Sequence, residues 1–233
     1  NYTLSDYHTD GIDATSDGDL DPIDRTSGSF NIGGVLSEKT NAKLNILNTN
    51  ATIEYDDSWG TPKPDNNLTQ FNIKVNHQLS EKLNTKFDYL NQKTQRRGDK
   101  YKLNTIAIIN EYTLDNGKLS VGISDTVDKD IGKTKQIKHT DLFSQWQGVI
   151  NDNELSLGAR IVDHDKFSIH NTYNVNWAKN LHNDVRVTAS FGKATNLPDH
   201  YKNNQNLTNG KTELKPEHSK NIEFSASKDY GTW

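Results

Sequence analysis

Apolar and polar residues alternate along segment after segment of the chain. Between residues 70 and 79, Phe71, Ile73 and Val75 alternate with asparagine, lysine and glutamine side chains. A period of two residues is that of a β-strand with two unlike faces. The same pattern, with some less regular members, predicts about twelve strands. They lie near residues 1–7, 28–37, 42–55, 70–79, 83–89, 102–114, 119–123, 140–150, 155–161, 169–177, 185–191 and 220–229.

The connections between these segments fall into two classes of length. Short connections lie near residues 38–41, 80–82, 115–117, 151–153 and 180–183, and the third reads Asp115-Asn116-Gly117, which favours a tight hairpin turn. Long polar connections lie near residues 8–27, 56–67, 95–101, 128–139, 163–168 and 193–219. Short and long alternate, as in outer-membrane barrels with tight turns at one rim and larger loops at the other. We therefore predict an all-β fold, an antiparallel up-and-down transmembrane β-barrel with the five short turns on one rim.

The amino-acid composition suits a barrel with a wet interior. Only 31% of the residues are hydrophobic, and no stretch approaches the roughly 18 apolar residues of a membrane helix. In such a barrel Val121 and Leu157 face lipid, whereas Asn72 and Arg160 face the lumen. The chain begins inside a predicted strand, and unpaired strand edges are not tolerated in lipid. We expect residues 1–233 to form a partial barrel domain that belongs to a longer protein.

The charge balance and the absence of known motifs argue against several classes of function. Lys and Arg number 27 against 31 Asp and Glu, and this net charge of −4 argues against a nucleic-acid partner. The absence of cysteine excludes disulfides, thiolate zinc sites and thiol catalysis. No HExxH, GxSxG, Walker A or Rossmann fingerprint is present. Short His/Asp clusters occur at residues 8–10, 139–141 and 163–165, and we expect no catalytic role for them.

The first long connection is the most chemically specific stretch. It carries six aspartates between residues 10 and 24, and clustered carboxylates separated by glycine suit calcium, which takes several oxygen ligands in flexible loops. Pro22 stands where an EF-hand has its turn glycine, so the loop is not an EF-hand. The candidate calcium ligands are Asp13, Asp17, Asp19, Asp21 and Asp24, with Asp56, Asp57 and Asp65 from the next long connection, which would lie beside the first. A solvated acidic loop is the alternative.

A basic run flanks another of the long connections. It consists of Lys93, Arg96, Arg97, Lys100 and Lys102. In an outer leaflet such side chains could pair with lipopolysaccharide phosphates, because the arginine fork matches phosphate oxygens. The alternative is a solvated loop tip.

Two segments near the C-terminal end resemble the TonB-dependent outer-membrane receptors. Residues 187–201 read VTASFGKATNLPDHY and are similar to a strand-to-loop segment of that family, although Thr195 stands where the family usually has proline. Residues 214–223 read LKPEHSKNIE and resemble a second family segment. The acidic loop 13–24 and the loop 56–65 are similar to the calcium-loop region of the cobalamin (vitamin B12) receptor subfamily.

This resemblance implies a barrel of about 22 strands in the bacterial outer membrane, surrounded by lipid and lipopolysaccharide. In that family an N-terminal plug domain fills the barrel, and TonB supplies energy through a short N-terminal box; neither appears in residues 1–233. The expected ligand is cobalamin, with an iron-siderophore or haem as the alternative. The candidate ligand-contacting loops are residues 8–27, 56–67 and 193–219.

Two other classes of protein are also compatible with this sequence. A soluble, calcium-binding secreted β protein would stay in solution without detergent and bury its apolar face in a dry core. An outer-membrane enzyme would need a Ser/His or Asp/His constellation at one rim of a complete, closed barrel. The two rivals and the receptor differ first in where the apolar side chains point.

Overall fold

The structure, a computed structural model, describes residues 1–13, 18, 20–55, 64–133, 135–198, 202, 209–228 and 230. Within them twelve β-strands are found: β1 Tyr2–Thr9, β2 Ile23–Ser37, β3 Thr40–Ile53, β4 Asp65–Gln78, β5 Leu83–Arg96, β6 Asp99–Leu114, β7 Gly117–Asp130, β8 Lys135–Ile150, β9 Asn153–His164, β10 Ser168–Asn180, β11 Val185–Asn196 and β12 Glu217–Lys228. Among the described residues, no helix has the length and apolar character needed to cross a bilayer.

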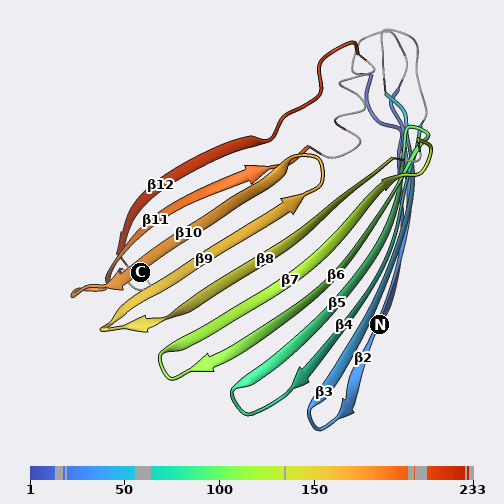
Figure 1. Cartoon of the computed structure of the whole chain (residues 1–233). Helices are drawn as coiled ribbons and strands as arrows, with labels where there is room; N and C mark the ends of the chain where they lie inside the picture. The colour runs from blue at the N-terminus through green and yellow to red at the C-terminus, as the bar shows by residue number, and fades with distance from the viewer. Residues whose placement is uncertain are drawn as a thin grey trace. The chain divides into compact units, whose positions relative to one another are not determined.

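The twelve strands form one sheet in chain order, from β1 to β12 (Figure 1). The pairings β1–β2, β2–β3, β8–β9, β9–β10, β10–β11 and β11–β12 are antiparallel, each with a defined register. Sequential antiparallel strands satisfy one another's backbone N–H and C=O groups and need only tight turns between them. The predicted all-β, up-and-down fold is confirmed.

The lengths of the connections agree with the prediction at one end of the strands only. The connections β2–β3, β4–β5, β6–β7, β8–β9 and β10–β11 are the five predicted short turns. At the other end the connections 10–22, 54–64 and 197–216 are long, but 97–98, 131–134 and 165–167 are short turns. The prediction of six long loops was therefore wrong for three of them. In those places the strands continue through polar residues that show no apolar alternation.

The turn at residues 97–98 shows how a long polar segment becomes a hairpin. Arg97 and Gly98 both have positive φ values, 51° and 84°, which matches the twist of the flanking strands. At the Asp115-Asn116-Gly117 hairpin the turn lies where predicted, but Gly117 already belongs to β7. A Cβ atom at Gly117 would lie 2.3 Å from the Gln147 carbonyl oxygen. That glycine is required by the close approach of β8 and not by the turn.

By its internal contacts the chain divides into two compact units, which we describe separately. Unit 1 comprises residues 1–76, 87–106 and 126–136. Its polar face carries a hydrogen-bond network: Asn45 donates to Asn72 at 3.3 Å, and Asn72 donates to Asp88 at 2.5 Å. Asn72 is buried. On the opposite face the rings of Phe71 and Tyr89 make an edge contact with centroids 6.3 Å apart.

Unit 2 comprises residues 77–86, 107–125 and 137–233, and its two faces differ in the same way. Its apolar face exposes Val121, Ile123, Leu157, Ile161 and Val175, each 40–49% accessible. Its polar face holds the buried carboxylate of Asp141, which is 2% exposed. Within the described residues the buried apolar side chains are Ile137, Val162 and Ala178.

This arrangement is the reverse of a soluble sheet, in which apolar side chains cover a dry core. Here the apolar side chains are exposed and the polar side chains form networks, as expected where the surrounding solvent is hydrocarbon. The exposed apolar face argues against the soluble secreted protein.

We predict that Val121→Arg destabilises the full barrel by about 2–4 kcal/mol, because the arginine charge would enter lipid near mid-membrane. The measurement is the free energy of unfolding in lipid vesicles by denaturant titration. Ser120→Arg, one residue away on the polar face, is the matched control and should cost much less. Equal costs at the two positions would contradict the assignment of faces.

Candidate ligand-binding sites

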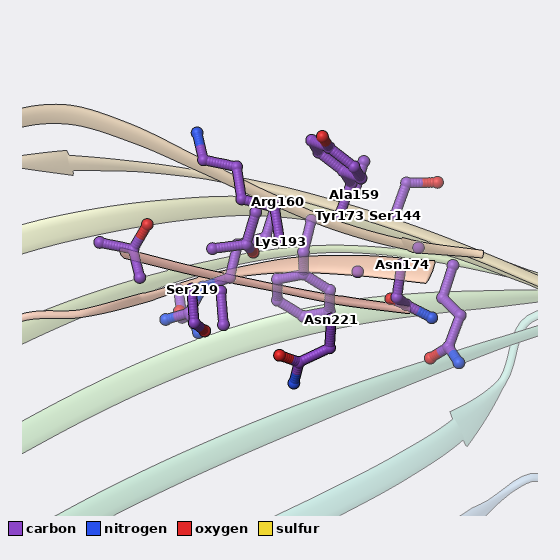
Figure 2. A pocket seen from close by; sticks show the side chains of 16 residues that line it. Ser144, Ala159, Arg160, Tyr173, Asn174, Lys193, Ser219 and Asn221 are labelled. Carbon is purple, nitrogen blue, oxygen red and sulfur yellow. The ribbon is translucent and has the colours of Figure 1, made fainter. Parts of the chain in front are cut away.

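A concave site of about 730 Å³ lies on the polar face of unit 2. Its floor is a row of cross-strand neighbours from β8 to β12, namely Gln145, Gly158, Asn174, Gly192 and Asn221. Figure 2 shows Asn174, Asn221 and Ser219 on one side of the sheet, with Tyr173 and Lys193 pointing to the other. The site therefore offers amide groups from β8, β10 and β12 and a hydroxyl group from β12.

Gly158 makes room for the side chain of Asn174 in this site. A Cβ atom at Gly158 would lie 2.3 Å from Asn174 Oδ1. The amide of Asn174 therefore lies over Gly158 and occupies the space that a larger side chain would take.

Arg160 supplies a cationic group of this site, and its position is fixed by Asp141. The guanidinium contacts Asp141 Oδ1 through Nη2 at 2.9 Å and through Nε at 3.2 Å. Asp141 also accepts a hydrogen bond from the Ser124 hydroxyl at 3.0 Å. A buried carboxylate held by several donors is a rigid anchor. The Arg160 side chain is 49% exposed, so it can meet a ligand while this anchor holds it.

A smaller cavity of about 410 Å³ lies in unit 1, between the ends of β3, β4 and β5. It is lined by Tyr55, Arg96 and Arg97, among others. The guanidinium carbon of Arg97 lies 4.7 Å from the centre of the Tyr55 ring, a cation–π contact. The predicted basic run is thus part of a tight turn over a cavity, and not the flank of a long loop.

The predicted calcium ligands are only partly within the described residues. Asp17, Asp19, Asp56 and Asp57 lie outside them. Asp13 accepts a hydrogen bond from the Gly18 amide at 3.0 Å, and the Asp21 amide donates to the Ile12 carbonyl at 3.3 Å. The strand register and a hydrogen bond place Asp24, Thr52 and Asp65 in one row across β2, β3 and β4.

Two of these aspartates already have protein partners. Asp24 contacts His8 Nδ1 at 2.5 Å, and the hydrogen bonds from Asp24 and then Asp10 raise the pKa of the exposed His8. Asp65 accepts a hydrogen bond from Thr52 at 3.3 Å. In the part of the chain that the structure describes, no three His, Asp or Glu side chains are grouped so that they could hold a metal ion.

The structure does bring the first two long connections together. The Glu54 amide donates to the Pro22 carbonyl at 3.0 Å, so the end of the first connection meets the start of the second. Glu54 itself is 5% exposed, and it is not among the site residues predicted from the sequence. The sequence feature that could have identified Glu54 is its position, because it is an acidic residue directly after the last residue of an alternating strand pattern.

A buried histidine lies at the hairpin between β9 and β10. His164 is 4% exposed, and its Nδ1 accepts hydrogen bonds from the Lys166 and Phe167 amides at 3.1 and 3.2 Å. Its ring stacks on that of His139, with centroids 5.8 Å apart. Because Nδ1 accepts two N–H groups, His164 is neutral here, and burial lowers its pKa. His164 lies beyond Ile161, the last apolar residue on the lipid side of β9.

We predict that this turn loosens on acidification. The folded pKa of His164 lies below its ordinary value of 6.5, so the opened turn binds more protons between those two pKa values, and the stability of the turn falls as pH drops through 6.5. Hydrogen exchange of the Lys166 and Phe167 amides in the full protein, corrected for the intrinsic rate, should accelerate between about pH 7.5 and about pH 5.5. His164→Gln should remove the acceleration, whereas the exposed-site control His182→Gln should retain it. Persistence of the effect in His164→Gln would assign it to another group.

Antiparallel strands in chain order, with an exposed apolar face and a ligand-sized cavity on the polar face, are typical of part of an outer-membrane β-barrel. All of the chain, residues 1–233, matches the family model described as "TonB dependent receptor-like, beta-barrel". The chain therefore belongs to the TonB-dependent receptor β-barrel family. Proteins of this family are receptors of the bacterial outer membrane, which places the chain there.

Solved structures with the same fold are receptors and transporters. The siderophore receptor PirA from Acinetobacter baumannii is 15% identical, with a TM-score of 0.70 over 97% of this chain and 45% of that chain. The copper transporter OprC is 12% identical, with a TM-score of 0.70 over 98% of this chain and 46% of that chain. PirA from Pseudomonas aeruginosa is 14% identical, with a TM-score of 0.51 over 97% of this chain and 51% of that chain. The chain thus spans about half the length of these proteins. No curated protein sequence matches it significantly.

Proposed function

We propose that the chain is the barrel portion of a TonB-energised receptor for an iron-siderophore or a related metal chelate. The observation that carries this proposal is the cavity of unit 1, where Arg97 lies over Tyr55 beside Arg96. Guanidinium groups and an aromatic ring together favour an anionic, oxygen-rich or aromatic ligand. The structural likeness to siderophore and copper proteins supports the same class of ligand.

Cobalamin, the first expectation from sequence, has less support than the metal chelate. That expectation rested on the acidic loops, and Asp24 and Asp65 are engaged by His8 and Thr52. The solved proteins described above are named as a siderophore receptor and a copper transporter. Haem stays with the siderophore as a second metal chelate to be tested.

Energised transport requires parts of the receptor beyond this sheet. We propose that a plug domain and a TonB contact outside residues 1–233 complete the transporter, as the family membership implies. In that arrangement the polar face holds the captured chelate while the plug rearranges. Arg160, anchored by Asp141, and Arg97, placed over Tyr55, are two of the cationic groups that this chain contributes.

Arg97→Gln should weaken binding of the transported chelate to the full receptor by about tenfold, the loss of one charge-assisted contact. Titrations with a ferric siderophore, a haem and cobalamin, followed by tryptophan fluorescence, would show which ligand responds. Arg25→Gln is the matched control, because Arg25 also lies over a tyrosine ring, that of Tyr7 at 5.4 Å, but is not among the residues lining this cavity. Tight cobalamin binding without siderophore binding would overturn the proposal in favour of cobalamin.

We also propose that calcium organises the acidic loops of this receptor. The hydrogen bond between the Glu54 amide and the Pro22 carbonyl supports the idea, because it joins the end of the first acidic connection to the start of the second. Carboxylates gathered at one place repel each other unless a cation compensates them.

Removal of calcium with a chelator should weaken ligand binding by the full receptor, since the loops would have to be ordered during binding. The combined variant Asp17→Asn/Asp19→Asn/Asp21→Asn should bind ligand equally with and without calcium. Asp152→Asn, in a turn at the opposite end of the strands, is the control. Equal ligand affinity of the unmodified receptor in calcium and in chelator would leave the loops as solvated acidic surface.

A further inference from the structure

The cavity on the polar face of unit 2 (Figure 2) is lined in part by an aromatic ring that interrupts a polar pattern. Phe143 of β8 pairs directly with Arg160 of β9, and directly paired residues lie on the same face of a sheet. On that face of β8 the neighbours of Phe143 are Asp141 and Gln145, which are both polar. Exceptions to a local pattern of this kind concentrate at functional sites. Phe143 is therefore a candidate for ligand contact.

A glycine of the neighbouring strand fixes the position of this ring. A Cβ atom at Gly122 of β7 would lie 2.3 Å from Phe143 Cζ and 2.7 Å from Phe143 Cε2. The far end of the ring therefore rests on the Gly122 backbone, and Phe143 leans over β7, away from Arg160 on β9. Phe143 and Arg160 both line the cavity, so one ligand can meet the ring and the guanidinium together.

The charge of the cavity favours an anion. The described residues that line it include Arg160 but no aspartate or glutamate. The carboxylate that holds Arg160, that of Asp141, is buried and also accepts a hydrogen bond from Ser124. Asp141 contacts Nε and Nη2 of the half-exposed guanidinium, so Nη1 remains able to donate to a ligand.

A planar aromatic group with two adjacent phenolate oxygens, a catecholate, matches these features together. Its ring can pack on Phe143, because offset and edge contacts between aromatic rings are favourable. Its oxygens can accept hydrogen bonds from Arg160 and from the amide groups of Gln145 and Asn174. A hydroxamate also binds iron through two oxygens, but it has no ring and its ferric complex carries no net charge.

We propose that the cavity on the polar face of unit 2 binds an iron chelate of the catecholate type, and that Phe143 sets this preference. The inference rests on the proposed function and names the ligand class within it. One catecholate ring packs on Phe143, while Arg160 compensates the negative charge of the ferric complex. The cavity volume of about 730 Å³ lies in the range of sites that hold small ligands.

The test uses the full receptor in detergent, titrated with a ferric tris-catecholate and with a ferric tris-hydroxamate siderophore and followed by tryptophan fluorescence. The unmodified receptor should bind the catecholate about tenfold more tightly than the hydroxamate. Phe143→Leu removes the ring but keeps an apolar side chain, and it should weaken catecholate binding about fivefold without changing hydroxamate binding. Phe191→Leu, at an exposed phenylalanine on the apolar face of the same unit, is the matched control.

Gly122→Ala tests the position of the ring without removing it. The added methyl group would displace Phe143, so catecholate binding should weaken as in Phe143→Leu. Gly34→Ala is the control, because a Cβ atom there meets nothing within 4 Å. Arg160→Gln should weaken catecholate binding about tenfold, whereas Arg160→Lys, which keeps the charge, should retain most of it.

Unchanged catecholate affinity in Phe143→Leu and Gly122→Ala would overturn the proposal. Tighter binding of the hydroxamate, or binding of haem alone, would also overturn it but would leave the proposed function standing. If no iron chelate binds, haem included, the proposed function fails and this inference fails with it. A far-ultraviolet circular dichroism spectrum confirms that each variant is folded.

Discussion

Every backbone N–H and C=O group of a lipid-exposed strand must be bonded to a neighbouring strand, because hydrocarbon offers no other partner. This requirement explains why consecutive strands pair in chain order across the whole described sheet. It also explains why so little apolar burial is needed within the chain, where Ile137, Val162 and Ala178 are the buried apolar residues described. The fold therefore depends on the backbone hydrogen bonds between strands, and the side chains determine whether each face is apolar or polar.

On the polar face, side-chain networks replace a hydrophobic core. Asn72 links Asn45 to Asp88 across three strands, and Asp141 links Ser124 to Arg160 across β7, β8 and β9. A buried polar group is costly when unpaired and rigid when fully bonded. These networks therefore fix the relative register of the strands and, at the same time, fix the groups that a ligand would meet. Structural and functional roles coincide in the same residues.

The alternation of residues was enough to predict the strands and their order, because one period-two pattern dictates both faces. The alternation did not predict the strand ends next to the turn at Arg97 and Gly98. The strands there consist of polar residues, which show no alternation of apolar and polar positions. The alternation also missed contacts set by neighbouring strands, such as Gly117 against Gln147. Glu54 was missed for the same reason, because its burial depends on the connection that ends at Pro22. The acidic pattern suggested cobalamin, but a loop composition does not report which ligand a barrel binds.

Gly192 and Lys193 are neighbours along β11, and they belong to opposite faces of the sheet. Gly192 belongs to the row that floors the polar cavity, and Lys193 follows Phe191 on the apolar face. A slip of one residue in the pairing of β11 with β12 would exchange the two faces. It would place a lysine charge in the cavity and Gly192 opposite lipid. The pairing of Gly192 with Asn221 therefore fixes the floor of the ligand cavity and the apolar face of β11 together.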